Sequence, residues 1–317
     1  MYTINSEYMD WLRHKQCYVK PSTIGNYDII YHRHIKDNEI ADMDVLEIKS
    51  KHFQALIDRL HSTTKLSPKS IKDVVTLTKN ILFWILDREE LPLPTLRIKY
   101  PCEMGLAKEL AVYDQSEMKK IAAYILEHPS PSGVAIIVTM MTGLRIGETC
   151  GLQWGDVDPK ERTITIRRIT ERVMKPQSLV PTRKGRSYVN IGSPKTRTSA
   201  RIIPLPPSLV KLIQKARGLS PDNYFIASGS EKPIEPRRMR NIFDITLMAA
   251  GVRRLRFHGL RHSFATNMIR SGIDIPTVSA LLGHNNISTT LDYYTHACLE
   301  GKKQAMRVYY KKKDLLG

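Results

Sequence analysis

Two arginines, two histidines and a tyrosine occur in four short patterns between residues 142 and 296. Guanidinium groups are permanent cations whose forked donors match phosphate oxygens. Histidines exchange protons near neutral pH, and a phenol can form a reversible ester with phosphorus. Together these groups could cleave a phosphodiester. They are Arg145 in the segment 142–148, His258 with Arg261 three residues later, His284 after a Leu-Gly pair, and Tyr294 before Thr-His.

Each pattern alone has a more ordinary interpretation. An arginine usually forms a surface salt bridge, a lone histidine is usually a structural hydrogen-bonding group, and a tyrosine usually packs in a core. Two features favour a functional role here. Arg145 follows a glycine at the end of an apolar segment, and Arg261 shares a helix face with His258 at a spacing of three. We leave His262 out of the site, because we place it about 100° around the helix from His258.

In this order the four patterns resemble the tyrosine recombinase family of phage integrases, Xer-type recombinases and mobile-element integrases. The resemblance implies that Arg145 and Arg261 meet the negative charge that develops on a scissile phosphate. It also implies that His258 acts as acid or base and that His284 binds this phosphate. Strand exchange would pass through a 3′-phosphotyrosine and a Holliday junction, and the resemblance implies no metal ion, nucleotide triphosphate or other cofactor.

The expected nucleophile is one of two adjacent tyrosines. Members of the resembled family place this tyrosine nine or ten residues after the histidine that corresponds to His284, which gives Tyr293 or Tyr294. The family tyrosine also precedes a small residue and a histidine, as Tyr294 does. We therefore choose Tyr294 and keep Tyr293 as the alternative.

Two further residues take roles through the resemblance. The family places a lysine on a β-turn to protonate the departing 5′-oxygen, and Lys195 lies on the turn expected before the strand at 200–205. Lys184, in the basic stretch upstream, is the second choice. Glu148 follows Arg145 by one helical turn and is expected to support the site by orienting Arg145 or a histidine, although it could equally be an exposed helix charge.

Composition limits the partners of the chain. Its 49 Lys and Arg outnumber 31 Asp and Glu, for a net charge of +18 and a pI near 9.7. Residues 1–100 carry 15 basic and 13 acidic groups, whereas residues 101–317 carry 34 and 18. Such an excess favours a polyanion, and double-stranded DNA is the partner we expect. A membrane partner is not expected, because no apolar run approaches the roughly 20 residues that span a bilayer.

The cysteines and the first residues of the chain indicate the cellular compartment in which the protein works. The four cysteines form no C-x-x-C pair, so neither a disulfide framework nor a zinc site is indicated. The first residues lack the charged and then apolar pattern of a secretory signal. We expect a cytoplasmic protein. Many integrases of the resembled family carry an N-terminal arm-site domain, which we do not expect in this sequence; either this member manages without it or the chain is truncated.

Periodicity predicts a mainly α fold with a small antiparallel β-sheet in two domains. The first would be a four-helix bundle, with apolar residues at helical spacing. Prolines then indicate a linker. Helices are expected again from residue 207 onward, apart from a turn at 219–222. The expected helices of the bundle cover residues 4–15, 21–35, 48–60 and 67–86.

The second domain is expected to begin with a capped helix from residue 114 and a buried apolar helix at 134–141 that ends at Gly143. Strands are expected at 163–166, 188–191 and 200–205, with a basic hairpin or loop at 167–186. The predicted division is a helical core-type DNA-binding domain at 1–90, a linker at 91–112, and a catalytic domain with a basic tail at 113–317.

We therefore predict a site-specific DNA recombinase or integrase that inserts or excises a mobile element. The resemblance implies a homotetramer on DNA, aided by DNA-bending accessory proteins. Three alternatives stay open: an Xer-type chromosome or plasmid dimer resolvase, a type IB topoisomerase, and a DNA-binding regulator without catalysis.

Overall fold

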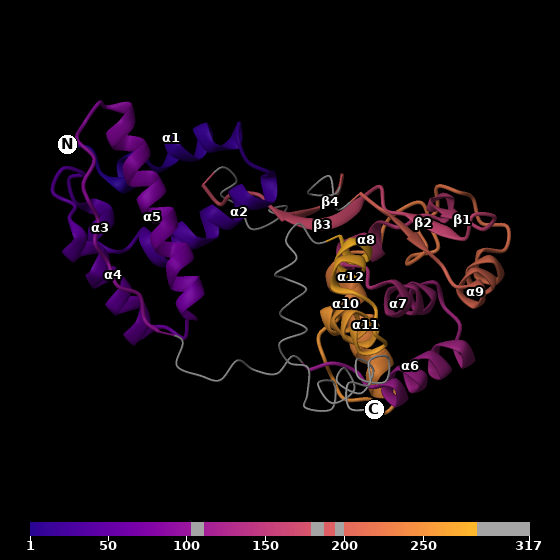
Figure 1. Cartoon of the computed structure of the whole chain (residues 1–317). Coiled ribbons are helices and arrows are strands. Elements are labelled where there is room, and N and C mark those ends of the chain that lie inside the picture. Colours follow the sequence, from indigo (N-terminus) through magenta and orange to yellow (C-terminus); the bar gives the residue numbers. More distant parts are fainter. Residues whose placement is uncertain (103–110, 179–186, 194–199, 284–317) are drawn as a thin grey trace, which may run out of the picture. The chain divides into compact units, whose positions relative to one another are not determined.

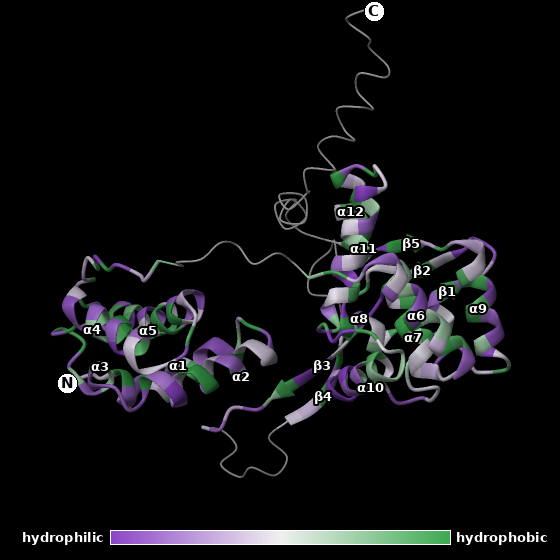
Figure 2. Ribbon diagram, turned by 90° about the horizontal axis from the view of Figure 1, so that it is seen from below, coloured by the Kyte–Doolittle hydropathy of each residue, from purple (hydrophilic) through white to green (hydrophobic). Residues whose placement is uncertain are grey.

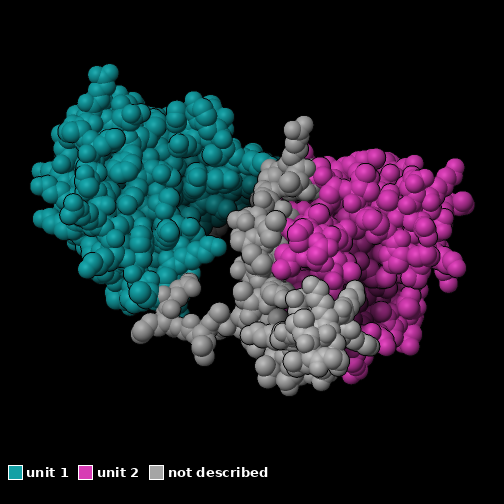
Figure 3. Space-filling view, in the orientation of Figure 1, with its two compact units in different colours: residues 1–107, 172–188 teal, residues 108–171, 189–317 magenta. Residues whose placement is uncertain are grey.

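The structure is a computed structural model that describes residues 1–102, 111–178, 187–193 and 200–283. The chain divides into two compact units, shown in different colours in Figure 3. The first unit contains residues 1–107 and also 172–188, and the second contains residues 108–171 and 189–317. A segment from the middle of the sequence therefore packs with the N-terminal helices.

The N-terminal part of the first unit is built from helices (Figure 1). All four helices expected from periodicity form, and the second continues into one π-helical turn, η1. A short helix, α3, was not expected. The elements are α1 (Ile4–Gln16), α2 (Pro21–Ile30), η1 (Tyr31–Ile35), α3 (Glu39–Asp42), α4 (Ser50–Thr63) and α5 (Pro68–Arg88).

Capping residues and an apolar stripe explain why α5 forms. The Ser67 side chain accepts the backbone N–H of Ser70, and Pro68 occupies the first helical position, where a proline costs no hydrogen bond. The helix packs against α1, α4 and η1. Figure 2 shows the hydrophobic residues along α4 and α5, and Ile71, Leu82 and the other core residues of α5 are almost completely buried.

The basic stretch expected as a hairpin or loop at 167–186 contains a strand, β3 (Ile169–Met174). It pairs with β4 (Ser187–Gly192), which forms where a strand was expected at 188–191, and the two make a separate two-stranded sheet. The end of β3 packs on α2. A Cβ atom at Gly25 would lie 2.2 Å from the carbonyl oxygen of Met174, so only glycine permits this approach. The Asp28 carboxyl group accepts hydrogen bonds from the Ser178 hydroxyl, at 2.6 Å, and from the backbone N–H of Gln177.

The second unit combines a three-stranded antiparallel sheet with helices. The strand order is β1-β2-β5, and Ile164 of β2 lies opposite Val157 on one side and Ile203 on the other. The strands are β1 (Val157–Asp158), β2 (Thr163–Thr165) and β5 (Ile202–Pro204). The helical elements are α6 (Gln115–Glu127), α7 (Pro131–Thr142), α8 (Ile146–Gly151), η2 (Trp154–Asp156), α9 (Pro207–Arg217), α10 (Pro236–Ala249), α11 (His258–Arg270) and α12 (Ile275–Leu282).

Helix α7 is the centre of this unit. Its sequence is apolar on every side, and it contacts α6, α8, α9, α10 and α11. A helix that is hydrophobic all round must be surrounded by other elements. One expectation was wrong: after the turn at 219–222 the chain does not return to helix until Pro236, and Phe225 instead forms isolated bridges with Gln153 and Ser230.

The predicted fold class, mainly α with a small antiparallel sheet in a two-domain chain, is confirmed. In the part of the chain that the structure describes, no helix is both long and apolar enough to cross a membrane.

Candidate active site

The turn after α7 places the first arginine. Gly143 ends the helix with a φ of +67°, a left-handed conformation that glycine adopts without strain. A Cβ at this position would also lie 2.6 Å from Phe264 and 2.7 Å from Leu282, so α11 and α12 approach the backbone closely here. Leu144 then enters the core, and Arg145 becomes the N-cap residue of α8. The arginine backbone is therefore held between three helices.

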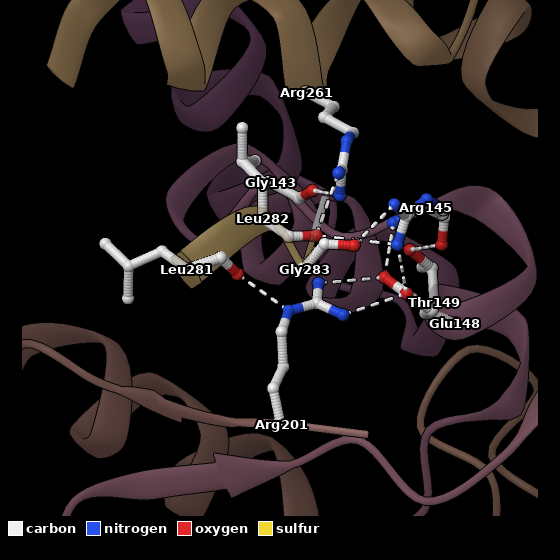
Figure 4. Close-up of polar contacts among 9 residues, drawn as sticks. All are labelled: Gly143, Arg145, Glu148, Thr149, Arg201, Arg261, Leu281, Leu282 and Gly283. Atoms are coloured by element: carbon white, nitrogen blue, oxygen red, sulfur yellow. Dashed lines mark hydrogen bonds and ion pairs between the residues drawn. The ribbon is translucent and has the colours of Figure 1, made fainter. Parts of the chain in front are cut away.

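The Arg145 side chain is fixed by a carboxylate and by carbonyl groups (Figure 4). Nη1 donates to Oε1 of Glu148 at 2.9 Å, and Nη2 donates to the carbonyl oxygen of Gly283 at 2.9 Å. The backbone N–H donates to Oε2 of Glu148 at 2.8 Å, and the backbone carbonyl accepts from the Thr149 hydroxyl at 3.1 Å. The side chain still keeps 36% of its surface exposed, so a ligand can reach it.

Glu148 is buried and binds a second arginine. Nη1 and Nη2 of Arg201 donate to its two carboxylate oxygens at 2.9 and 3.0 Å. Burial alone would raise the pKa of Glu148, but the hydrogen bonds and charge of Arg201, followed by those of Arg145, lower it below its ordinary value. The carboxylate is therefore ionised at neutral pH and contacts both the side chain and the backbone of Arg145.

Arg201 was missed in the sequence. It lies just before β5, in a region crowded with basic residues, so its residue type gave no signal. Its side chain is only 7% exposed, and its Nε donates to the carbonyl oxygen of Leu281 at 2.6 Å. The available signal was strand alternation: Arg201 lies two positions before the buried Ile203, so both side chains face the same side of the strand. The adjacent isoleucine at position 202 hid that signal.

Arg261, on α11, is almost completely buried. Its Nη1 donates to the carbonyl oxygen of Gly143 at 2.8 Å, and its Nη2 donates to that of Leu282 at 2.8 Å. Nη1 of Arg145 lies 3.4 Å from the same Leu282 oxygen. The two guanidinium groups therefore converge, although 116 positions separate them in the sequence.

The C-terminus of α12 is the common acceptor. The last carbonyl groups of a helix have no partner within the helix and carry partial negative charge. Here the carbonyl oxygens of Leu281, Leu282 and Gly283 accept hydrogen bonds from Arg201, Arg261 and Arg145. The next residue along the chain is position 284. Two of these guanidiniums, those of Arg145 and Arg201, also contact the carboxylate of Glu148.

His258 begins α11 and lies beside the arginines. Partial burial of its ring, followed by the effects of His262, Arg261 and Arg145, lowers its pKa to about 4. The residue keeps an exposed side, so a ligand can reach an imidazole that is neutral at pH 7. Our placement of His262 away from His258 was wrong. The two rings contact at a centroid distance of 4.5 Å, because a spacing of four brings side chains onto one helix face.

Several predicted site residues lie outside the described residues. These are Lys195 with its alternative Lys184, His284, and Tyr294 with its alternative Tyr293. The structure thus brings together Arg145, Glu148, His258 and Arg261. Among the described residues, no group of three or more His, Cys, Asp or Glu side chains is placed to hold a metal ion.

Comparisons with known proteins identify relatives of the whole chain. A model of the phage integrase family matches residues 112–300. A tyrosine recombinase XerC-like protein of Caldanaerobacter subterraneus subsp. tengcongensis is 28% identical over 308 residues, covering 90% of this chain and 77% of that protein. The ICEBs1 integrase of Bacillus subtilis is 26% identical over 297 residues, covering 87% of this chain and 74% of its own.

Two solved structures share the fold. One is the Tn1549 transposon integrase in complex with transposon right end DNA, with a TM-score of 0.71, 19% identity, and coverage of 97% of this chain and 99% of that chain. The other is a lambda integrase tetramer bound to a Holliday junction, with a TM-score of 0.60, 16% identity, and coverage of 92% and 77%.

Proposed function

This chain belongs to the phage integrase family of tyrosine recombinases, enzymes that cleave and rejoin DNA at specific sites, and we propose that Arg145 and Arg261 hold its scissile phosphate. The convergence of both guanidiniums on the Leu282 carbonyl oxygen carries this proposal. Forked cations at fixed positions stabilise charge on non-bridging oxygens without reorganising during the reaction. Glu148 orients Arg145 and does not touch the phosphate.

The proposed cleavage step uses Tyr294 as nucleophile. Its phenolic oxygen forms a bond to phosphorus while the bond from phosphorus to the 5′-oxygen breaks, which leaves a 3′-phosphotyrosine. Lys195 gives a proton to the departing 5′-oxygen. The low pKa of His258 leaves its imidazole neutral, so it can accept the phenolic proton, and His284 donates a hydrogen bond to the phosphate.

Rejoining reverses these bonds with a new partner. The 5′-hydroxyl of a second strand attacks the phosphotyrosine, which restores a phosphodiester and frees Tyr294. Two such exchanges proceed through a Holliday junction. We propose that four copies of the chain act together on double-stranded DNA in the cytoplasm, with DNA-bending accessory proteins. The lambda integrase tetramer on a Holliday junction supports this assembly by its likeness of fold.

The proposed biological role is insertion or excision of a mobile element. The similarity to the ICEBs1 integrase supports it. The XerC-like relative supports the second candidate, an Xer-type dimer resolvase. Plasmids that carry either the ends of an element or two copies of one chromosomal site distinguish these roles, because each role predicts recombination of only one pair.

A nicked duplex tests the proposed nucleophile. A nick next to the cleavage site lets the short fragment that carries the released 5′-hydroxyl diffuse away after cleavage. The covalent complex is then trapped and migrates slowly on a denaturing gel. We expect an adduct from the wild type and from Tyr293→Phe, but none from Tyr294→Phe, while all three bind DNA in a native gel. An adduct from Tyr294→Phe together with none from Tyr293→Phe would move the nucleophile by one residue.

A second assay separates recombination from other uses of the same chemistry. Two differently marked linear duplexes should yield mixed products with the wild type. Relaxation of a supercoiled circle without mixed products would indicate a topoisomerase, and binding without an adduct on any substrate would indicate a regulator.

A further inference from the structure

A cationic pocket lies beside the proposed phosphate site, within the second unit. Its volume is about 710 Å³. Its walls come from α10, from the segment that leads into α11, and from the first residues of α8 and α11. The residues that matter below are Ile146, Arg240, Asp244, Arg254, Arg256 and His258.

The charges of this pocket are only partly balanced by the protein. Nη2 of Arg254 donates to Oδ2 of Asp244, so one arginine is paired. Arg240 and Arg256 are exposed, and neither guanidinium group forms a hydrogen bond or an ion pair with any residue in the described ranges. Two permanent cations that share a hollow without acidic partners attract an anion from solution.

The position of the pocket indicates which anion it would meet. His258 lines the pocket and neighbours Arg261, and Ile146 lines it directly after Arg145. A DNA strand held with one phosphate at Arg145 and Arg261 must carry its next phosphates past the adjoining surface, because every nucleotide brings one. Phosphate contacts of this kind fix the position of a protein along the duplex without reading its sequence.

We infer that this pocket binds a phosphodiester that flanks the scissile one. Arg240 and Arg256 contact its oxygens directly, and Asp244 holds Arg254 at the edge of the pocket. The inference rests on the proposed function, since it takes the scissile phosphate at Arg145 and Arg261 as its reference point. Its consequence is that the pocket fixes which phosphate of the strand meets the nucleophile.

Uncharged phosphate analogues give a direct test. A series of duplexes carries one methylphosphonate each, at successive positions on either side of the cleavage site, and the wild-type chain is titrated against each by fluorescence anisotropy. We expect one flanking position at which the substitution weakens binding by about tenfold or more, the loss typical of a phosphate contact made by arginines. If no flanking methylphosphonate weakens binding, the inference is wrong.

The double variant Arg240→Gln/Arg256→Gln identifies the side chains responsible. It should bind the unmodified duplex more weakly, with the slope of log K against log salt reduced by about one for each arginine–phosphate interaction removed. In this variant, the methylphosphonate at the sensitive position should weaken binding by less than about twofold, because the arginines that contact that phosphate are already absent. An unchanged methylphosphonate effect in this variant would assign the phosphate to other side chains and overturn the inference.

Lys211→Gln is the matched control. Lys211 is an exposed cation on α9, which lies away from α10 in both ribbon views (Figures 1 and 2). Its substitution should leave the methylphosphonate pattern unchanged. The adduct assay on nicked DNA separates the two proposals. If the adduct forms but the double variant does not change the methylphosphonate effect, only the pocket inference is wrong. If the double variant abolishes the methylphosphonate effect but no adduct forms, the proposed catalysis is wrong and the pocket still binds a phosphate.

Discussion

Two buried carboxyl groups, Asp28 in the first unit and Glu148 in the second, receive their hydrogen bonds from two different kinds of donor. Each residue is 2% exposed. Glu148 is held by two guanidiniums, whereas Asp28 accepts from the Tyr8 hydroxyl at 3.1 Å, the Ser178 hydroxyl and the backbone N–H of Gln177. His32 Nε2 also lies 3.5 Å from Asp28.

The difference explains what each group does. Donors without permanent charge come to Asp28 from α1 and from the segment after β3, so this carboxyl fixes where a distant piece of chain attaches. The donors of Glu148 are permanent cations, Arg145 and Arg201. Glu148 therefore holds guanidinium groups of the site in place, whereas Asp28 attaches one segment of the chain to another. Changes at the two positions should differ in size and in what they disturb.

The largest effect is expected from Glu148→Gln. This change removes the charge of a carboxylate that Arg201 and Arg145 both contact, and breaking a buried ion pair from one side costs about 3–5 kcal/mol of unfolding free energy. Urea denaturation followed by circular dichroism measures it. Glu117→Gln is a close control, because Glu117 also caps its helix at the third position and pairs with an arginine, Arg253, at the surface. The control should lose about 1 kcal/mol or less, and equal losses would contradict the account.

The next effect is expected from Gly25→Ala. Alanine normally favours a helix, but the added Cβ would meet the Met174 carbonyl oxygen at 2.2 Å. Overpacking of this kind costs about 1–3 kcal/mol. Hydrogen exchange should increase in β3, because its packing on α2 is disturbed. Gly192→Ala is the control, since its nearest neighbour would be a side-chain nitrogen of Asn190 at 3.4 Å. Unchanged exchange in β3 of Gly25→Ala would show that this close approach does not occur.

Asp28→Asn should have a smaller effect than Glu148→Gln. An amide keeps one acceptor oxygen, but its NH₂ group cannot accept the hydrogen bond that the second carboxyl oxygen takes from Gln177. One unsatisfied donor costs about 1–3 kcal/mol, and no unpaired charge remains. The free energy of unfolding from urea titration measures the loss. A loss as large as that of Glu148→Gln would remove the distinction between the two carboxyl groups.

The effect that is smallest at neutral pH concerns the pH dependence of His258. Its pKa in the folded chain is about 4, below the ordinary 6.5, so the unfolded chain binds the proton more tightly. Protonation therefore destabilises the folded state as pH falls from 6.5 towards 4, and this contribution is absent above that window. An NMR titration of the His258 ring should show a midpoint well below 6.5, with Arg145→Gln moving it upward. A midpoint at or above 6.5 would contradict the described surroundings of the ring.

Local signals made much of the fold predictable. Prolines at first helical positions and the capping side chains of Ser67 and Asp114 fixed helix starts, and Gly143 fixed the end of α7. The convergence of Arg145 with Arg261 could be expected only through the family resemblance, because periodicity says nothing about contacts between distant helices.

Other features could not be predicted for physical reasons. The attachment of β3 to α2 depends on a missing side chain at Gly25 and on donors about 150 positions from Asp28. Arg201 lies among many basic residues, and two adjacent isoleucines left the inward face of β5 undecided. The contact between His258 and His262 was predictable from helix geometry, and our estimate of the angle between them was wrong.

The most direct test of the central claim removes the charge that Arg145 is proposed to meet. The wild type and Arg145→Ala are compared on a nicked duplex with an ordinary scissile phosphate and on one whose scissile phosphate is a methylphosphonate. On the ordinary duplex, we expect the variant to form the adduct about 10²–10³ times more slowly. On the uncharged duplex the two proteins should differ by less than about tenfold, because little charge remains to be stabilised. The same large difference on both duplexes would contradict the claim that Arg145 acts on the scissile phosphate.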